Sequence, residues 1–310
     1  MSESAHVLLD DLRPAGCREP GTQIAKTRLL GLDALRGILA IAVVARHTSF
    51  LTHFELVPSG FFAVDVFFMM SGFVIAHAYE AKLLKRNYVR EYIWRRYSRL
   101  APMWVIGLSI GTVSTIIFAH RDVTAMTNAS IGFIFGIFFI PAFFGKWLFL
   151  SNPPGWSLFF EVTANFLYAF LVRILRRRIL IITVVGGAIL VAFASWGNRG
   201  MDGGPTWATA YIGVARTIFG FAVGIIIYER RSLLTGRKLP GALFVICVAA
   251  FCAIMAVNPG PRYAFIFDLA VIITLCPLMV ILALNCDIGP RWLAESLGAL
   301  SYPLYAIHFA

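Results

Sequence analysis

Arg36 and His47 lie eleven residues apart in the first long apolar stretch of the chain, LLGLDALRGILAIAVVARHTSFL. An ionisable side chain in a membrane span is costly, so each of the two is a candidate functional residue. Because a helix rises about 1.5 Å per residue, the two side chains share a face and differ in depth by roughly 16 Å. Such a pair could bind an anionic group near one side of a membrane and transfer a proton near the other. The competing interpretation is an arginine that extends to the interface and a histidine that hydrogen-bonds to a neighbouring helix.

Three other groups that can exchange protons are expected at the depth of His47, because each lies toward the outer end of an apolar stretch. They are Asp65 in GFFAVDVFFMMSGF, Glu161 in PPGWSLFFEV and His308 in the last stretch. A histidine has a reference pKa of about 6.5, which suits a general base near neutral pH. Asp65 or Glu161 is expected to orient the imidazole of His47 or to stabilise its protonated form.

Arginines gather at the inner level. Arg96 and Arg99 are three residues apart in WRRYSRLAP, so they share a helix face, and Arg36 is expected at a similar depth. Guanidinium groups match phosphate geometry and keep their charge, which predicts a site for a phosphate-bearing ligand that enters from the cytoplasm. The alternative is that these are ordinary basic residues flanking a span. Two further arginines, Arg46 and Arg216, could instead pair with the outer carboxylates, whose role would then be structural.

The composition is that of a polytopic helical membrane protein. Hydrophobic residues make up 59% of the 310 residues and charged residues 14%, against about 25% charged residues in soluble domains. Several apolar runs can cross a hydrocarbon core of about 30 Å, and alternating segments of the β-barrel type are absent. The net charge of +11 indicates contact with anionic lipid headgroups rather than with nucleic acid. The cysteines have no metal-binding spacing and lie mostly in apolar runs, so neither a zinc site nor a disulfide is expected. A tightly bound cofactor is not expected either.

The fold class predicted is all-α, with about ten transmembrane or re-entrant helices and no soluble domain. The candidate spans are residues 32–51, 60–79, 99–119, 131–150, 157–173, 179–196, 209–228, 240–257, 265–284 and 292–310. Loops rich in Lys and Arg at 80–98, 173–178 and 230–238 predict the cytoplasmic side and place the N-terminus there. Residues 1–28 lack the apolar core of a signal peptide and are expected to be a disordered cytoplasmic tail, ahead of a membrane domain at 29–310.

One span does not fit this orientation. If residues 131–150 crossed the membrane completely, the arginines at 173–178 would lie outside. The segment contains Pro141 and Lys146, and we expect it to be re-entrant or confined to the outer half. Irregular backbone at that depth requires surrounding protein or a water-filled cavity. The alternative is that one basic loop is an exception to the positive-inside pattern.

An inner arginine cluster with an outer set of histidines and carboxylates suits two kinds of function. One is transfer of a group from a phosphorylated cytoplasmic donor to an acceptor at the outer face. The other is a transporter or exporter of a glycan or lipid-linked substrate, in which the same groups form a proton relay. A membrane scaffold or sensor is disfavoured, because it has no physical need for Arg36, His47 and Glu161.

Five motifs, in order along residues 31–310, resemble those of the acyltransferase-3 family of integral membrane acyltransferases. The motifs are RGILAIAVVARH, GFFAVDVFFMMSGFVI, WRRYSRLAPMW, PPGWSLFFEV and LGALSYPLYAIH. The first resembles the Arg-x10-His signature of the family's first span. In the fourth, Val162 follows Glu161 where the family pattern has a second acidic residue. The chain stops at residue 310, where the family's last helix usually continues, so a longer last helix is expected in a complete chain.

The resemblance implies an enzyme of the bacterial inner membrane that moves an acyl group, often acetyl, from acyl-CoA to a hydroxyl of a carbohydrate or glycolipid. Acyl-CoA (acetyl-CoA) would be a co-substrate, and the remaining partners would be the acceptor and membrane lipids. Carried over by motif, Arg36 and His47 would be the essential pair, with Arg96 and Arg99 at the donor end.

The mechanism expected from these residues is general-base catalysis. His47 would take the proton from the acceptor hydroxyl as that hydroxyl attacks the thioester carbonyl. Ser71 and Tyr302 are the candidates for stabilising the resulting oxyanion, and His308 is a further candidate site residue. An acyl-histidine intermediate is an open alternative to direct transfer.

Overall fold

The computed structural model describes residues 29–48, 55–85, 87–119, 122–174, 177–198, 200–236, 238–286 and 289–309. The tail expected at residues 1–28 lies outside the described residues. The described chain is helical, and its extended pairings are two isolated bridges, Trp147 with Thr206 and Leu239 with Cys286. The helices are α1 (Leu30–His47), α3 (Phe62–Leu83), α4 (Val89–Phe118), α5 (Val123–Ile137), α6 (Gly155–Leu171), α7 (Arg177–Asn198), α8 (Ala210–Glu229), α9 (Arg231–Leu234), α10 (Gly241–Met255), α11 (Gly260–Ala270), η2 (Val271–Leu275), α12 (Cys276–Asn285) and α13 (Arg291–Ile307).

Five helices in the described part of the chain are long and apolar enough to cross a membrane. They are α3, α4, α7, α8 and the continuous element formed by α11, η2 and α12. The expected count of about ten is therefore not confirmed. Helices α5 and α10 are apolar but have 15 residues each, while α6 and α13 have 17. The protein is an all-helical membrane protein, as the composition predicts.

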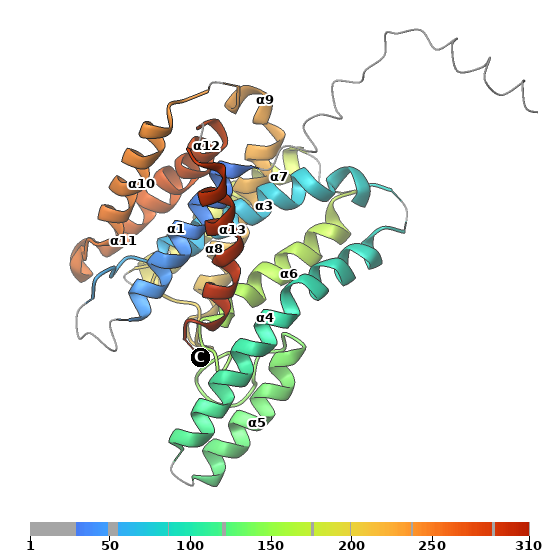
Figure 1. Ribbon diagram of the computed structural model, residues 1–310, viewed down its shortest axis with the longest axis vertical. Coiled ribbons are helices and arrows are strands. Elements are labelled where there is room, and N and C mark those ends of the chain that lie inside the picture. Colours follow the sequence, from blue (N-terminus) through green and yellow to red (C-terminus); the bar gives the residue numbers. More distant parts are fainter. Residues whose placement is uncertain are drawn as a thin grey trace, which may run out of the picture.

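Helices α3 and α8 form the centre of the molecule, and α1 packs against α13 beside them (Figure 1). Two glycines allow the close approach of α3 and α8. A Cβ at Gly224 would overlap the carbonyl oxygen of Met69, and a Cβ at Gly72 would overlap the carbonyl oxygen of Phe221. The small-residue pair Gly220 and Gly224 therefore serves helix packing, the role that such spacing predicts.

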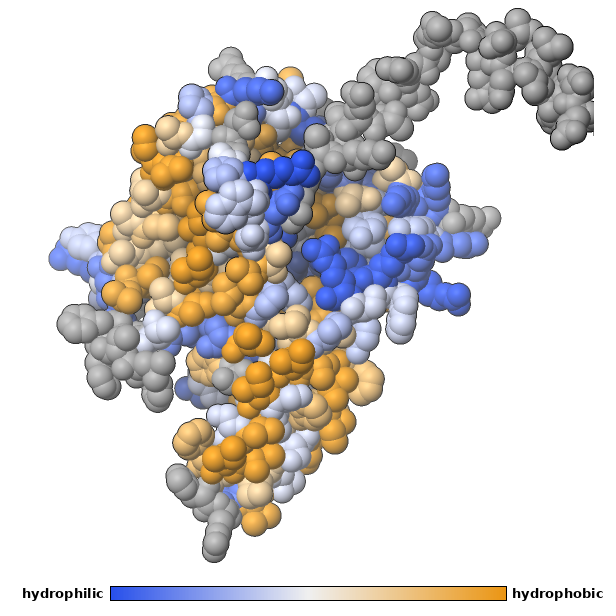
Figure 2. Space-filling model, in the orientation of Figure 1, coloured by the Kyte–Doolittle hydropathy of each residue, from blue (hydrophilic) through white to orange (hydrophobic). Residues whose placement is uncertain are grey.

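The basic loops come together at one end of the helices. The guanidinium of Arg173, just after α6, donates to the carbonyl oxygens of Leu83 and Lys85 at the end of α3. At the end of α8, the ring of Tyr228 contacts His77 of α3. Figure 2 shows hydrophilic side chains gathered where α3 ends and α4 begins. We call this end of the protein the basic side, and the end where α1 and α13 finish the histidine side.

The segment expected as one span at 131–150 is divided in the structure. Helix α5 ends at Ile137, and residues 138–154 form an irregular connection to α6. At about 1.5 Å per residue, the 15 residues of α5 measure roughly 22 Å, less than a hydrocarbon core of about 30 Å. Its end lies against the middle of α4, where the indole of Trp104 donates to the carbonyl oxygen of Gly136 at 2.7 Å.

The chain therefore does not return to the basic side along α5. Helix α6 makes that return, running parallel to α3, and it delivers Arg173 to the basic side. Helices α4 and α5 form a hairpin that projects from the remaining helices, with apolar side chains over its surface (Figures 1 and 2). This arrangement agrees with the expectation that 131–150 makes no complete crossing.

Candidate functional site

A cavity between α1, α3, α4, α6 and α13 collects the predicted donor-site arginines, and we call it the arginine cavity. Its lining includes Arg36, Arg96 and Arg99, together with Glu161 as a single carboxylate. Its volume of about 130 Å³ is below the ~300–1,000 Å³ of a cavity that encloses a whole ligand. We therefore expect it to hold one part of an anionic ligand whose remainder lies at the surface.

Arg96 is the arginine whose surroundings are most informative. Its side chain is buried, yet Nε has no hydrogen-bond partner among the described residues. Nη2 lies 3.6 Å from Oε1 of Glu161, an ion pair rather than a close hydrogen bond. Buried donors are normally satisfied, so an unpaired guanidinium N–H beside a cavity indicates a place for an acceptor atom of a ligand.

His47 and His308 form a pair where α1 and α13 end. Nδ1 of His47 lies 3.2 Å from Nε2 of His308 and 2.9 Å from the carbonyl oxygen of Val43. Nδ1 of His308 lies 2.9 Å from the carbonyl oxygen of Tyr305. Because a carbonyl oxygen only accepts, these contacts assign a proton to Nδ1 in both rings. Nε2 of His47 is then left with the lone pair that a general base requires, and Nε2 of His308 accepts from Nδ1–H of His47.

The structure does not bring the predicted carboxylates to His47. Both oxygens of Asp65 accept from Arg216, at 2.9 and 2.8 Å, and both side chains are fully buried. Glu161 accepts from Ser71 at 2.7 Å and lies in the arginine cavity. The expectation that Asp65 or Glu161 orients the imidazole of His47 is thus not met in this structure. The side chain that contacts Nδ1 of His47 is instead that of His308. The alternative pairing of Arg216 with a carboxylate is the one observed.

The two candidate oxyanion donors also lie on the arginine side of the site. Ser71 uses its hydroxyl hydrogen for Glu161, and the hydroxyl of Tyr302 donates to the carbonyl oxygen of Leu100. Both residues line the arginine cavity. Tyr305 and Ser157, whose hydroxyls contact each other, lie nearer to the histidines.

A second cavity, the linking cavity, lies between the arginine cavity and the histidines. It has a volume of about 240 Å³, and its lining includes His47, Val64 and Tyr305. Val64 and Tyr305 also line the arginine cavity, so these two side chains lie between the two spaces. Apart from Asp65, the predicted site residues thus form two groups, one around the arginines and one of the two histidines, with Val64 and Tyr305 between them.

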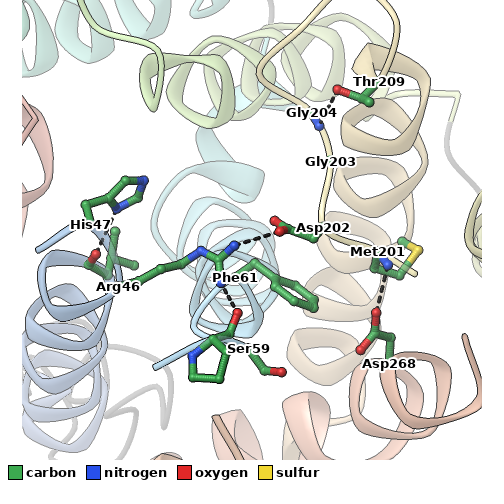
Figure 3. Close-up of polar contacts among 12 residues, drawn as sticks. Arg46, His47, Ser59, Phe61, Met201, Asp202, Gly203, Gly204, Thr209 and Asp268 are labelled. Carbon is green, nitrogen blue, oxygen red and sulfur yellow. Dashed lines mark hydrogen bonds and ion pairs between the residues drawn. The ribbon is translucent and has the colours of Figure 1, made fainter. Parts of the chain in front are cut away.

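Arg46 forms a polar cluster beside His47 that sequence reasoning did not assemble. Its Nη2 donates to Asp202 at 2.7 Å, and its Nη1 donates to the carbonyl oxygen of Pro58 (Figure 3). Asp202 comes from the glycine-rich segment GMDGGP in the connection before α8. The one feature of the sequence that pointed to Asp202 is its position as a carboxylate in a glycine-rich connection at the outer end of a predicted span. In the described part of the chain, no three His, Cys, Asp or Glu side chains are grouped to hold a metal ion.

Chemically, this arrangement combines a cationic cavity with an imidazole base about three helical turns away on the same helix. The model of the acyltransferase-3 family, described as an acyltransferase domain, matches residues 29–310. The chain belongs to the acyltransferase-3 family. It is an acyltransferase of the membrane, as the five motifs predicted.

Several curated proteins are similar to this acyltransferase. Protein 2 in the picA locus of Rhizobium radiobacter is 31% identical over 192 residues, which cover 56% of this chain and 98% of that protein. The peptidoglycan O-acetyltransferase OatA of Listeria monocytogenes is 22% identical over 320 residues, 93% of this chain and 50% of OatA. BcsY of Komagataeibacter xylinus, which carries the provisional name of membrane-bound transacylase, is 26% identical over 303 residues, 92% of this chain and 73% of BcsY. The chain thus spans about half the length of OatA. No solved structure matches it.

Proposed function

We propose that this protein is an O-acyltransferase that moves an acyl group, acetyl in the simplest case, from acyl-CoA to a hydroxyl of a carbohydrate acceptor. The main observation behind the proposal is the position of the arginine cavity. It adjoins the linking cavity, which His47 lines, and the two share Val64 and Tyr305. The names of two relatives, a peptidoglycan O-acetyltransferase and a membrane-bound transacylase, support the same reaction class.

In this proposal the arginine cavity binds the phosphate end of the donor. Arg36, Arg96 and Arg99 carry three positive charges. The carboxylates near them in the described chain are Glu161 in the cavity lining and Asp33, which lies 3.8 Å from Arg36, so the cavity still favours an anion. The unpaired Nε of Arg96 supplies a donor for a phosphate oxygen. The extended pantetheine arm would then pass Tyr305 and carry the thioester toward His47. The basic side would face the cytoplasm of an inner membrane, as the positive-inside pattern predicts.

His47 is the proposed general base. Its Nε2 takes the proton from the acceptor hydroxyl while the hydroxyl oxygen attacks the thioester carbonyl. The tetrahedral intermediate expels the CoA thiolate, which takes up the proton from Nε2 of His47, so the products are the ester and free CoA and His47 is again neutral. His308 holds the Nδ1–H tautomer of His47 and acts as a positioning residue. The hydroxyl of Tyr305, beside both cavities, is the nearest candidate donor to the oxyanion.

The competing function is a transporter or exporter that uses the same polar residues as a proton relay. Membership of the acyltransferase-3 family favours the enzyme. The structure contributes a second reason, because both oxygens of Asp65 are held by Arg216 and are not available to pass protons to the histidines.

The test is acyl transfer by the purified chain in lipid nanodiscs with labelled acetyl-CoA. We expect His47→Ala to lower CoA release about 10²–10⁴-fold without loss of acetyl-CoA binding. Arg96→Gln should weaken acetyl-CoA binding, whereas Arg95→Gln should leave it unchanged because Arg95 is exposed and paired with Glu91. Full activity of His47→Ala would refute the base, and equal binding by both arginine variants would refute the donor site.

A further inference from the structure

A cavity on the histidine side has no role in the mechanism above, and we call it the acidic cavity. It has a volume of about 490 Å³, within the ~300–1,000 Å³ typical of ligand sites. It lies between the end of α1, the chain before α3, the loop around Asp202 and the start of α11. Its lining includes His47, so a ligand held there would be next to the proposed base.

The carboxylate of Asp268 indicates that this cavity is a ligand-binding site. Its side chain is 2% exposed, and Oδ2 accepts from the backbone N–H of Met201 at 2.7 Å (Figure 3). Oδ1 is buried and has no hydrogen-bond partner among the described residues. Since a buried carboxylate oxygen is costly to leave unsatisfied, Oδ1 is suited to accept a hydrogen bond from a bound ligand.

The loop that carries Asp202 is held in place by the buried pair of α3 and α8. The guanidinium of Arg216 donates to the carbonyl oxygens of Met201 and Gly203, at 3.3 and 3.2 Å, as well as to Asp65. Met201 is thereby fixed at both its N–H and its carbonyl. The part of the cavity wall that this loop forms is therefore held by hydrogen bonds to the buried Arg216 and Asp268, which favours a fixed binding geometry.

Charge decides which ligand the acidic cavity can accept. Among its described lining residues, the carboxylates of Glu55, Asp202 and Asp268 outnumber the one guanidinium, that of Arg46. Arg46 already pairs with Asp202 and lies 5.4 Å over the ring of Phe61. An anionic ligand would meet repulsion here, while hydroxyl groups would find carboxylate acceptors. The arginine cavity has the opposite balance, so the two cavities select different substrates.

We propose that the acidic cavity binds the acceptor, and that the acceptor group bound there is an uncharged sugar unit. This inference rests on the proposed function and adds the location and charge of the acceptor. Asp268 and Asp202 accept hydrogen bonds from its hydroxyls, which leaves another hydroxyl toward Nε2 of His47. Phe61 and Phe309, which also line the cavity, give the sugar ring an apolar surface.

The experiment measures CoA release by the full chain in nanodiscs, with and without added sugar, for a panel of neutral methyl glycosides. Methyl glucoside is the reference probe, and methyl glucuronide is its anionic counterpart of similar shape. We expect saturable stimulation by at least one neutral glycoside and at least about tenfold weaker stimulation by the glucuronide. Equal stimulation by the two, or basal CoA release that no neutral glycoside raises, would overturn the proposal.

Two variants locate the effect. Asp268→Asn should raise the KM for the glycoside roughly tenfold or more, while the KM for acetyl-CoA stays as in the wild type. Asp202→Asn, at a more exposed position, provides the same test if Asp268→Asn does not fold. Asp122→Asn, at the exposed N-cap of α5, is the matched control. A wild-type KM in both cavity variants would place the acceptor elsewhere, whereas no acetyl-CoA turnover at all would instead refute the proposed function.

Discussion

At the scale of single residues, the tautomer of His47 depends on two partners that lie far apart in the sequence. Val43 is one helical turn away, while His308 is 261 residues away. Together they hold the proton on Nδ1 and leave Nε2 as the basic nitrogen. An imidazole can thus be oriented by a second imidazole where other enzymes use a carboxylate.

His308→Ala should therefore lower kcat for transfer by about tenfold or more, less than the loss expected for His47→Ala. The physical reason is that His47 would lose one partner that fixes its tautomer and orientation but would keep the other. The KM for acetyl-CoA should not change, and steady-state kinetics separate the two parameters. His308→Gln, which retains a hydrogen-bond acceptor, should recover part of the rate. An unchanged kcat in His308→Ala would contradict the positioning role.

The pair of Asp65 and Arg216 is expected to act on stability. Asp65→Ala leaves the fully buried guanidinium of Arg216 without its counter-charge, which should lower the free energy of unfolding by about 3–5 kcal/mol. Thermal unfolding in detergent measures this change. The double variant Asp65→Ala/Arg216→Met should be less destabilised than the single one, because it buries no unpaired charge. If Asp65→Ala instead abolished transfer at wild-type stability, Asp65 would belong to the reaction.

The candidate site residues could be named from the sequence, but their partners could not. The depth of Arg36 and His47 follows from helix geometry, and the arginine cavity brings Arg36, Arg96 and Arg99 together as predicted. Depth does not determine rotation about the helix axis or the neighbouring helix. Asp65 therefore lies at the predicted level but faces Arg216, which comes from a helix 151 residues away.

At the scale of helices, the contact of α3 with α8 depends on backbone proximity. Gly224→Ala places a Cβ against the carbonyl oxygen of Met69, and such overpacking should cost about 1–3 kcal/mol. Gly186→Ala in α7 is the matched control, since no heavy atom lies within 4 Å of its added Cβ. Comparison of the two unfolding temperatures checks the prediction. Equal temperatures would show that α3 and α8 do not approach this closely.

Helix α5 should not carry the chain across the membrane. In a cysteine-free background, single cysteines at Asp122 and Lys146, on either side of α5, should react with an impermeant reagent from the same side. A cysteine at Lys85 should react from the other side, because Lys85 lies on the basic side, where Arg173 contacts its carbonyl oxygen. Labelling in oriented vesicles measures this. Reaction at 122 and 146 from opposite sides would mean that α5 crosses.

The hydropathy of the sequence predicts where helices occur more reliably than whether they span. The apolar stretch at 131–150 includes residues 138–150, which are irregular in the structure, because hydropathy alone does not distinguish apolar coil from apolar helix. Charge provides the better signal. The arginines at 173–178 predicted that residues 131–150 make no complete crossing. The contact of Arg173 with Lys85, which places Arg173 on the basic side, agrees.

At the scale of the whole molecule, cavities of opposite charge lie toward opposite sides. Among the charged lining residues, guanidinium groups are in the majority in the arginine cavity and carboxylates in the acidic cavity. His47 and Tyr305 lie between the two cavities. In the proposed mechanism, the donor and the acceptor therefore bind from different sides of the membrane. The carboxylates of the acidic cavity disfavour the phosphate-bearing donor there.

The most direct measurement of this claim uses sealed proteoliposomes with labelled acetyl-CoA and an impermeant neutral oligosaccharide. We expect labelled oligosaccharide when the two substrates are on opposite sides of the bilayer, and none when both are outside the vesicles. The transfer should disappear in His47→Ala and persist in Arg95→Gln. Equal transfer with both substrates on the same side would contradict an acyl group that passes from one side of the protein to the other.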